Sequence, residues 1–171
     1  GTDLPRAAQA LLAHYRARSD AARIIDLCRD LSAGDKGDTR FGPETVAVWR
    51  AGDFPWVGLT ATPLRRADGG VDWTHHGPRG DIEWAFALNR HRFVAPLITA
   101  FAADGDRAHL ACCAAWLDDW LNAVPALPES YGAVPAEWKP AWRNLECALR
   151  VCGSWPLAFF HGLQHGWLSD G

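Results

Sequence analysis

The sequence predicts an all-α fold that carries a long irregular segment near its N-terminus. Apolar residues recur at helical spacing over residues 6–31, 81–101, 107–123 and 139–160. Between the first two of these stretches, glycine and proline interrupt residues 32–80 almost throughout. Hydrophobic residues make up 49% of the 171-residue chain, which is enough apolar material for one core.

The N-terminal half divides into a helical part and a loop-rich part. Residues 6–31 are expected to form one amphipathic helix or a pair of helices, because the apolar stripe is broken at Ser19–Asp20. Within residues 32–80, two short strands are expected near 46–49 and 56–60. The rest of that segment is predicted to be loop.

The second half is predicted to be helical. Asp81 is placed to cap a helix that runs to about residue 101, with a kink at Pro96. The sequence Asp104–Gly105–Asp106 predicts a tight turn, which leads into a helix over 107–123. A last helix is expected over about 139–160, after a loop that contains several prolines.

Composition excludes several classes of function. Seventeen basic against twenty acidic side chains give a net charge of −3, so the chain lacks the basic surplus that neutralises nucleic-acid phosphates. No run approaches the roughly 18–20 apolar residues of a membrane span. The five cysteines are irregularly spaced and predict neither a disulfide framework nor a zinc site, and Cys112 and Cys113 are expected to be small buried side chains. Sequence signatures of serine hydrolases, phosphate-binding loops and dinucleotide-binding folds are missing, and no cofactor is expected.

A first candidate site is the run Asn89–Arg90–His91. It combines a neutral amide, a permanent cation and a titratable ring, which together suit the binding of a carboxylate. The alternative is an interior polar network that ties helices together. The sequence does not decide between these two interpretations.

A second candidate site combines Trp142, Glu146 and Arg150, which are four positions apart and would share one face of a helix. Glu146 precedes Arg150 in the order that favours an ion pair. A tryptophan ring beside an oriented guanidinium could present a flat surface and a bidentate anion ligand to an acidic sugar. The alternative is a structural salt bridge under an aromatic lid.

Two other groups of polar residues are interpreted as structural features, not as functional sites. His161 and His165 could share a metal ion, but Gly162 and Gly166 weaken the helical spacing, no third ligand is visible and no metal site is expected. The neighbouring Asp118–Asp119 point about 100° apart on a helix and are expected to form a solvated face.

Several of these residues also occur, in order, in a known family. Residues 81–156 resemble the N-terminal helical domain of the heparinase II/III-like polysaccharide lyases, a group that includes related alginate lyases. The matching residues are Glu83–Trp84, Leu88–Asn89–Arg90–His91, Ala100–Phe101, Asp104–Gly105–Asp106, Asp119–Trp120, Asn122, Pro125, Trp142, Leu145–Glu146, Arg150 and Trp155. Asp104 departs from the family pattern, which has threonine there.

The resemblance implies a particular architecture. Residues 1–80 would be a helical and loop-rich lead-in, and residues 81–171 the first helices of an incomplete (α/α) toroid. The β-sandwich domain of the family would be absent from this chain. The catalytic residues would lie beyond Gly171, so the chain alone is expected to be inactive, and its substrate-binding candidates are Asn89, Arg90, His91, Trp142, Glu146 and Arg150.

The resemblance also implies a function. It is the cleavage of a uronic-acid-containing polysaccharide by β-elimination, in which an amide or histidine stabilises the uronate carboxylate while a tyrosine or histidine moves protons. The expected partners are the acidic polysaccharide and the remainder of the same polypeptide, and the expected location is the bacterial periplasm or the outside of the cell. A different hypothesis is a non-catalytic, glycan-binding helical module that uses the tryptophans and arginines.

Overall fold

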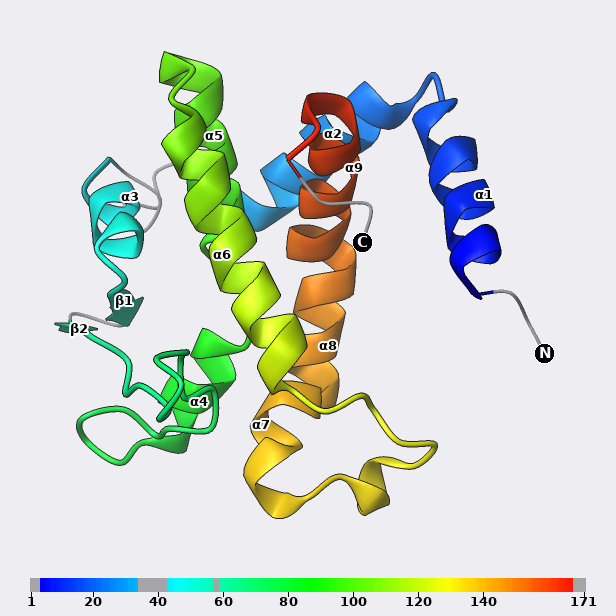
Figure 1. The fold of residues 1–171 in the computed structure, drawn as a ribbon. Helices are drawn as coiled ribbons and strands as arrows, with labels where there is room; N and C mark the ends of the chain where they lie inside the picture. The colour runs from blue at the N-terminus through cyan, green and yellow to red at the C-terminus, as the bar shows by residue number, and fades with distance from the viewer. Residues whose placement is uncertain (1–3, 34–42, 57–58, 168–171) are drawn as a thin grey trace.

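The computed structural model describes residues 4–33, 43–56 and 59–167, and this part of the chain is mainly helical (Figure 1). The helices are α1 (Leu4–Arg16), α2 (Ala21–Ala33), α3 (Pro43–Arg50), α4 (Ile82–Leu88), α5 (Val94–Asp104), α6 (Arg107–Ala123), α7 (Lys139–Trp142), α8 (Asn144–Leu149) and α9 (Trp155–His165). Short 3-10 turns lie at Tyr131–Ala133 and Ala136–Trp138, and a π-helical turn at Arg150–Ser154 joins α8 to α9. The all-α class is confirmed, and the described residues contain no β-sandwich.

The only strands in the described ranges form a small hairpin, and one predicted strand was wrong. Strand β1 (Phe54–Trp56) pairs antiparallel with β2 (Leu59–Ala61). Residues 46–49, expected as a strand, lie in α3. Val46 and Trp49 are both buried three positions apart, so the apolar pattern follows a helix face and not a strand face.

The N-terminal pair of helices is confirmed. Helices α1 and α2 are separated at the predicted polar break, where the Nε of Arg18 donates a hydrogen bond to Asp20 (2.7 Å). Helix α1 lies at the edge of the domain beside α9, whereas α2 packs across α9 and the π-helical turn (Figure 1).

The predicted helix from Asp81 to about residue 101 is two helices. Asp81 caps α4 as expected, by accepting a hydrogen bond from the backbone of Glu83 (2.9 Å). The chain then leaves the helix at Asn89, and His91 has a left-handed backbone (φ 55°). Pro96 lies in the first turn of α5, where the missing N–H costs nothing, so it causes no kink.

The turn at 104–106 and helix α6 are confirmed. Gly105 takes the left-handed conformation that ends α5 (φ 75°), and Asp106 caps α6 by accepting from the backbone of Ala108 (2.9 Å). Helix α6 spans Arg107–Ala123, as predicted, and packs along α5. Asp104 also has a defined role here, because its carboxylate lies 3.0 Å from Nε2 of His109.

The predicted helix over 139–160 was wrong as a single helix. It is broken at Arg143, whose backbone is extended (ψ 139°), and a π-helical turn follows α8. After the break, side chains of this segment contact the turn that follows α4, since Glu146 bonds to Arg90 and Arg150 to the carbonyl of Asn89.

Aromatic side chains contact one another in the core. The ring centroid of Trp49 lies 5.4 Å from that of Phe54, 5.5 Å from Phe93 and 5.3 Å from Trp116. The largest fully buried side chains also include three polar ones, His91, Glu146 and Arg150. Within the described ranges, no helix has both the length and the apolar character that a membrane crossing requires.

Candidate functional site

The six side chains predicted as substrate-binding candidates converge in the centre of the domain. Three come from the turn after α4, and three come from the segment that runs from α7 to the π-helical turn. Five of them are buried and one, Trp142, is half-buried. They are Asn89, Arg90, His91, Trp142, Glu146 and Arg150.

Glu146 is the one acidic residue of the six, and its fully buried carboxylate pairs with Arg90. The Nη2 and Nε atoms of Arg90 donate to Oε1 of Glu146 at 2.9 and 3.2 Å, and the side chain of Glu146 has no exposed surface. Nε of Arg143 lies 3.6 Å from the other carboxylate oxygen. The predicted pairing of Glu146 with Arg150 was therefore wrong, because each side chain bonds to the turn after α4 instead, Glu146 to Arg90 and Arg150 to the carbonyl of Asn89.

Arg150 lies inside a cage of tryptophans. The centre of its guanidinium lies 4.9 Å from the ring centroid of Trp120, 5.1 Å from Trp155 and 5.6 Å from Trp142. Cation–π attraction partly replaces the lost hydration of such a buried cation. Burial nevertheless lowers the pKa of Arg150 from its ordinary value, against the opposing fields of Cys147 and Glu146.

Backbone oxygens complete the surroundings of Arg150. Its Nη1 donates to the carbonyl of Asn89 and its Nη2 to that of Ala141, each at 2.6 Å. Ser154 makes a parallel contact, because its hydroxyl donates to the carbonyl of Arg90 (3.1 Å). The π-helical turn therefore attaches α9 to the end of α4 through the backbone of the turn at residues 89–90.

Asn89 uses both ends of its amide. Its Nδ2 donates to the carbonyls of Trp73 (2.9 Å) and Ala85 (2.8 Å), and its Oδ1 accepts from Nε1 of Trp120 (2.8 Å). One buried amide thus joins the loop before α4, α4 itself and α6.

His91 is a buried, neutral imidazole. Its Nδ1 accepts a hydrogen bond from Nε1 of Trp155 (2.9 Å), so the proton of the neutral ring is on Nε2, which is buried without a partner. Burial, and secondarily the charge of Arg150, hold the pKa of His91 well below its usual range. Its left-handed backbone is uncommon for a residue with a side chain and is held by the packing around it.

Together these contacts describe an interior polar network. The polar atoms of Asn89, Arg90 and Arg150 are largely committed to other protein groups, and the side chains are shielded from solvent. Trp142 reaches nearest to the surface, and its Nε1 donates to the carbonyl of Pro125 (3.0 Å). Direct binding of substrate by the six residues stays a prediction.

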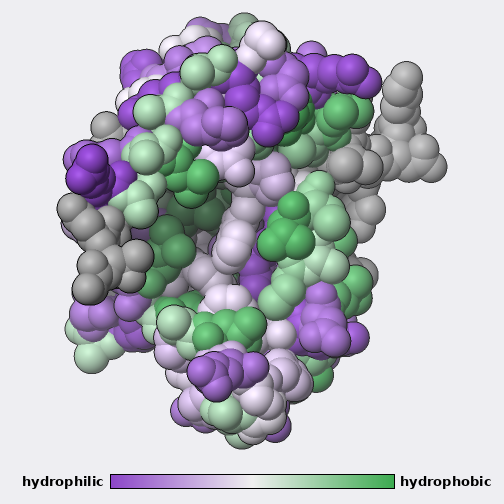
Figure 2. Space-filling model, turned by 90° about the vertical axis from the view of Figure 1, so that its right-hand side faces the viewer, coloured by the Kyte–Doolittle hydropathy of each residue, from purple (hydrophilic) through white to green (hydrophobic). Residues whose placement is uncertain are grey.

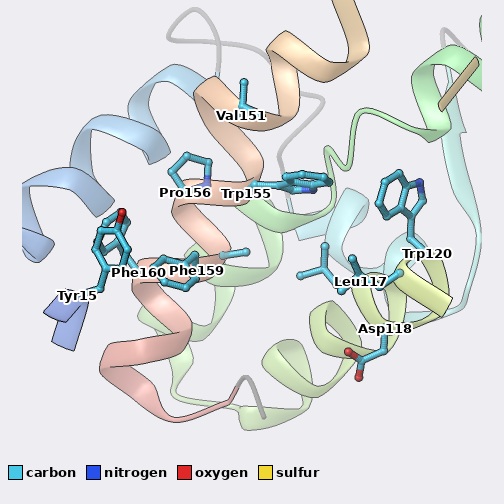
Figure 3. A pocket seen from close by; sticks show the side chains of 11 residues that line it. Tyr15, Leu117, Asp118, Trp120, Val151, Trp155, Pro156, Phe159 and Phe160 are labelled. Carbon is cyan, nitrogen blue, oxygen red and sulfur yellow. The ribbon is translucent and has the colours of Figure 1, made fainter. Parts of the chain in front are cut away.

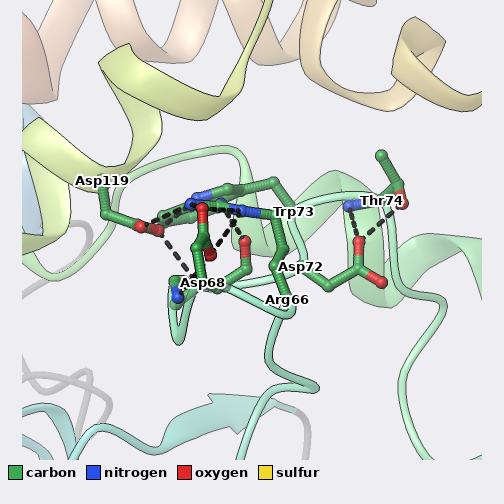
Figure 4. A network of polar contacts seen from close by, with 8 residues as sticks. Arg66, Asp68, Asp72, Trp73, Thr74 and Asp119 are labelled. Carbon is green, nitrogen blue, oxygen red and sulfur yellow. Dashed lines mark hydrogen bonds and ion pairs between the residues drawn. The ribbon is translucent and has the colours of Figure 1, made fainter.

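A second polar cluster, which the sequence did not reveal, is centred on Asp119 (Figure 4). Its carboxylate accepts from Nη2 of Arg66 (3.0 Å), the backbone N–H of Val71 (3.0 Å) and Nε1 of Trp73 (2.8 Å). The expectation of a solvated face at Asp118–Asp119 was thus wrong for Asp119 and holds for the exposed Asp118. Asp119 fastens the loop at residues 66–73 to α6.

An apolar groove lies beside the central network, between α1, α6 and α9 (Figures 2 and 3). Its cavity volume is about 520 Å³. Trp120 and Trp155 belong to both features, because their N–H groups donate inward to Asn89 and His91 while the residues also line the groove. The lining residues are Tyr15, Leu117, Asp118, Trp120, Leu121, Val151, Trp155, Pro156, Ala158, Phe159 and Phe160.

Comparison with protein families identifies the chain. The profile of the heparinase II/III N-terminus family matches residues 1–165. The chain belongs to this family. The predicted resemblance is confirmed, and the matched region includes the lead-in before residue 81 as well as the later helices. Searches of curated proteins and of solved structures gave no significant match.

In this heparinase II/III N-terminus domain, the histidine pair of α9 stacks ring on ring. The ring centroids of His161 and His165 are 4.2 Å apart, and Nδ1 of His161 accepts from Nε1 of Trp167 (2.8 Å). Among the described residues, no group of three or more His, Cys, Asp or Glu side chains is arranged to hold a metal ion. All five cysteines are free thiols, and Cys113 is fully buried, which raises the pKa of its thiol well above the ordinary value.

Proposed function

We propose that this chain is the N-terminal portion of a polysaccharide lyase that cleaves an acidic, uronic-acid-containing polysaccharide by β-elimination. Its membership of the heparinase II/III N-terminus family, over residues 1–165, is the observation that carries the proposal. At the level of the family, the chain is a domain related to polysaccharide lyases. The proposed partners are the polysaccharide and the remainder of the enzyme, and the proposed location is the periplasm or the extracellular space of a bacterium.

β-Elimination needs several chemical groups, and we do not propose that residues 1–171 supply all of them. A base removes the proton at C5 of the uronate, a C4=C5 double bond forms, and the bond from C4 to the glycosidic oxygen breaks as that oxygen takes up a proton. A neutral donor must also stabilise the charge that develops on the carboxylate. The proposed catalytic groups lie outside this chain, and the chain contributes the scaffold that supports them.

The interior network is well suited to a scaffold role. It fixes the turn that follows α4 against α6, α8 and α9 through Asn89, Arg90 and Arg150. A catalytic site requires supports that hold its groups within a fraction of an ångström, and buried side chains that are hydrogen-bonded to several elements provide such rigidity. Trp142 is half-buried, so its ring is the one among the six candidates for which we propose direct contact with the glycan.

The test is a lyase assay on the full natural protein that contains this chain. Heparin, heparan sulfate and alginate are offered separately, and the ultraviolet absorbance of the unsaturated uronate product is followed. We expect product from at least one substrate, and none from residues 1–171 alone. The absence of product on every acidic polysaccharide would overturn the proposal.

The glycan-binding module remains the second candidate, because the half-buried ring of Trp142 lies next to the partly exposed Arg143. Calorimetric titration of the isolated chain with uronate oligosaccharides distinguishes it. Binding that Trp142→Ala weakens, in a protein that gives no unsaturated product in its full-length form, would favour the module over the lyase.

A further inference from the structure

Cys28 lies on the face of α2 that packs against the rest of the domain. Among the described side chains of α2, those of Ala21, Ile25 and Cys28 are buried, and their spacing of four and then three positions places them on one face of the helix. Helix α2 is in direct contact with α9 and with the π-helical turn (Figure 1). The thiol of Cys28 therefore faces these two elements.

The π-helical turn carries a second thiol, that of Cys152, which is exposed to solvent. The two thiols influence each other, because burial and, secondarily, the charge of Cys152 raise the pKa of Cys28. The interaction of two charges falls with distance, so an effect of this kind requires the side chains to lie near each other. The buried face of α2 therefore meets the part of the turn that carries Cys152.

The packing of α2 on this turn suits a covalent bond between the two cysteines. Helices in direct contact have axes about 8–10 Å apart and Cα atoms about 2.3 Å from each axis, so facing Cα atoms lie about 4–6 Å apart. A disulfide needs Cα atoms about 4.4–6.8 Å apart. The other thiols are placed differently, since Cys112 and Cys113 point about 100° apart on α6 and the sulfur of Cys147 contacts Nη2 of Arg150 (3.4 Å).

We propose that Cys28 and Cys152 form a disulfide when the chain meets an oxidised thiol compound such as glutathione disulfide. The exposed Cys152 attacks one sulfur of that compound as a thiolate, so that one small thiol leaves and a mixed disulfide remains on Cys152. Cys28 then loses its proton and attacks the sulfur of Cys152, which releases the second small thiol. Two protein thiols are oxidised, one small disulfide is reduced, and the two leaving thiolates take up the two protons.

The bond attaches α2 to the segment that holds the interior network. Arg150 and Ser154, which bond to the carbonyls of Asn89 and Arg90, lie in the same turn as Cys152. Positions 28 and 152 are 124 residues apart, and a cross-link that closes so long a loop strongly restricts the unfolded chain. The disulfide is independent of the proposed lyase activity, and it would persist in the oxidising compartment proposed above.

The test counts free thiols in the purified 171-residue chain after equilibration with oxidised and reduced glutathione. Iodoacetamide blocks the remaining thiols in denaturant, and mass spectrometry shows how many cysteines it has modified. We expect modification of three of the five cysteines, with the peptides that contain Cys28 and Cys152 joined to each other. The oxidised protein should unfold at a temperature at least about 5 °C above that of the reduced protein.

Two variants and one matched control locate the bond. Cys152→Ser, a change at an exposed position, should leave all four remaining cysteines open to iodoacetamide and abolish the rise in unfolding temperature. Cys28→Ala should stop the reaction after its first step and accumulate one glutathione on Cys152. Cys147→Ser removes the cysteine nearest to Cys152 in the sequence, and it should keep both the bond and the rise.

Three results would overturn the proposal. One is modification of all five cysteines after equilibration with oxidised glutathione. Another is a bond from Cys152 to a different partner, either Cys147 or Cys152 of a second molecule, which peptide mapping and gels without reductant would reveal. The last is an equal unfolding temperature for the oxidised and reduced proteins, which would show that the bond does not hold α2 to the turn.

Discussion

Arg90 and Glu146 form an ion pair inside the domain, with 2.9 Å between Nη2 and Oε1 and 56 positions between them in the sequence. Arg90 follows α4 and Glu146 lies in α8, so the pair joins two segments that the backbone does not connect locally. Both groups have lost nearly all contact with water. The removal of one partner should therefore lower the stability of the domain more than the loss of an exposed ion pair would.

Glu146→Gln is expected to destabilise the domain by about 3 kcal/mol, because it removes the buried carboxylate bonded to Arg90 and leaves its guanidinium only the exposed carboxylate of Glu83, at 3.8 Å. Urea unfolding followed by tryptophan fluorescence measures the change. Asp20→Asn is the matched control, since it breaks the exposed pair with Arg18 and should change the stability little. Equal effects of the two substitutions would show that the buried pair stabilises the domain no more than the exposed pair does.

The sequence alone predicted the fold class and some helices correctly, because neighbouring residues determine these features. Helix α6 follows a turn with Gly105 and a capping Asp106, so adjacent residues determine where it begins. The segment after α7 is different, because its side chains contact residues that are distant in the sequence, with Glu146 bonded to Arg90 and Arg150 to the carbonyl of Asn89. No local pattern reports such contacts.

The candidate site shows the same limit. Sequence spacing grouped Asn89, Arg90 and His91, and the structure brings them together with the second candidate cluster. Burial could not be foreseen, because the same residue types serve both an interior network and an exposed anion site. Asp119 was missed since its three donors come from a loop 46 to 53 positions earlier, and nothing in the sequence separates it from Asp118.

Asp119→Asn is expected to destabilise the domain by about 2 kcal/mol, because an amide replaces one acceptor oxygen with a donor that faces other donors. Asp118→Asn provides a matched control one position away, and it should stay within about 0.5 kcal/mol of the unmodified protein. Thermal unfolding compares the two. Hydrogen exchange at the amide of Val71 gives a local measurement, since this N–H donates to Asp119 and should lose protection only in Asp119→Asn.

Gly77 and Gly80 form a matched pair for testing how closely a loop packs on Trp84. Both have left-handed backbones, with φ of 71° and 67°, so alanine costs about 1 kcal/mol of backbone strain at either position. A Cβ on Gly77 would lie 2.5 Å from Cγ of Trp84, whereas a Cβ on Gly80 meets nothing within 4 Å. Gly77→Ala should therefore cost about 1–3 kcal/mol more than Gly80→Ala in urea unfolding. Similar losses for both variants would contradict this close packing.

His91 should make the stability of the domain depend on pH in a defined window. The folded protein holds the pKa of His91 well below 6.5, because the ring is buried and lies near Arg150. The unfolded chain binds a proton near the ordinary value, so it carries more protons than the folded state at mildly acidic pH. The free energy of unfolding therefore falls as the pH drops below about 6.5, by about 1.4 kcal/mol per pH unit for this one group.

His91→Asn tests this assignment. Asparagine tolerates a left-handed backbone, and its side-chain oxygen can accept from Nε1 of Trp155, but it does not titrate. Urea unfolding between about pH 5 and 7 should show a smaller slope for the variant than for the unmodified protein. The carboxylates with lowered pKa values, such as those of Asp104 and Asp106, lose their contribution at lower pH than this window and are present in both proteins. Parallel curves for the two proteins would assign the pH dependence to other groups, because only the titration of His91 differs between them.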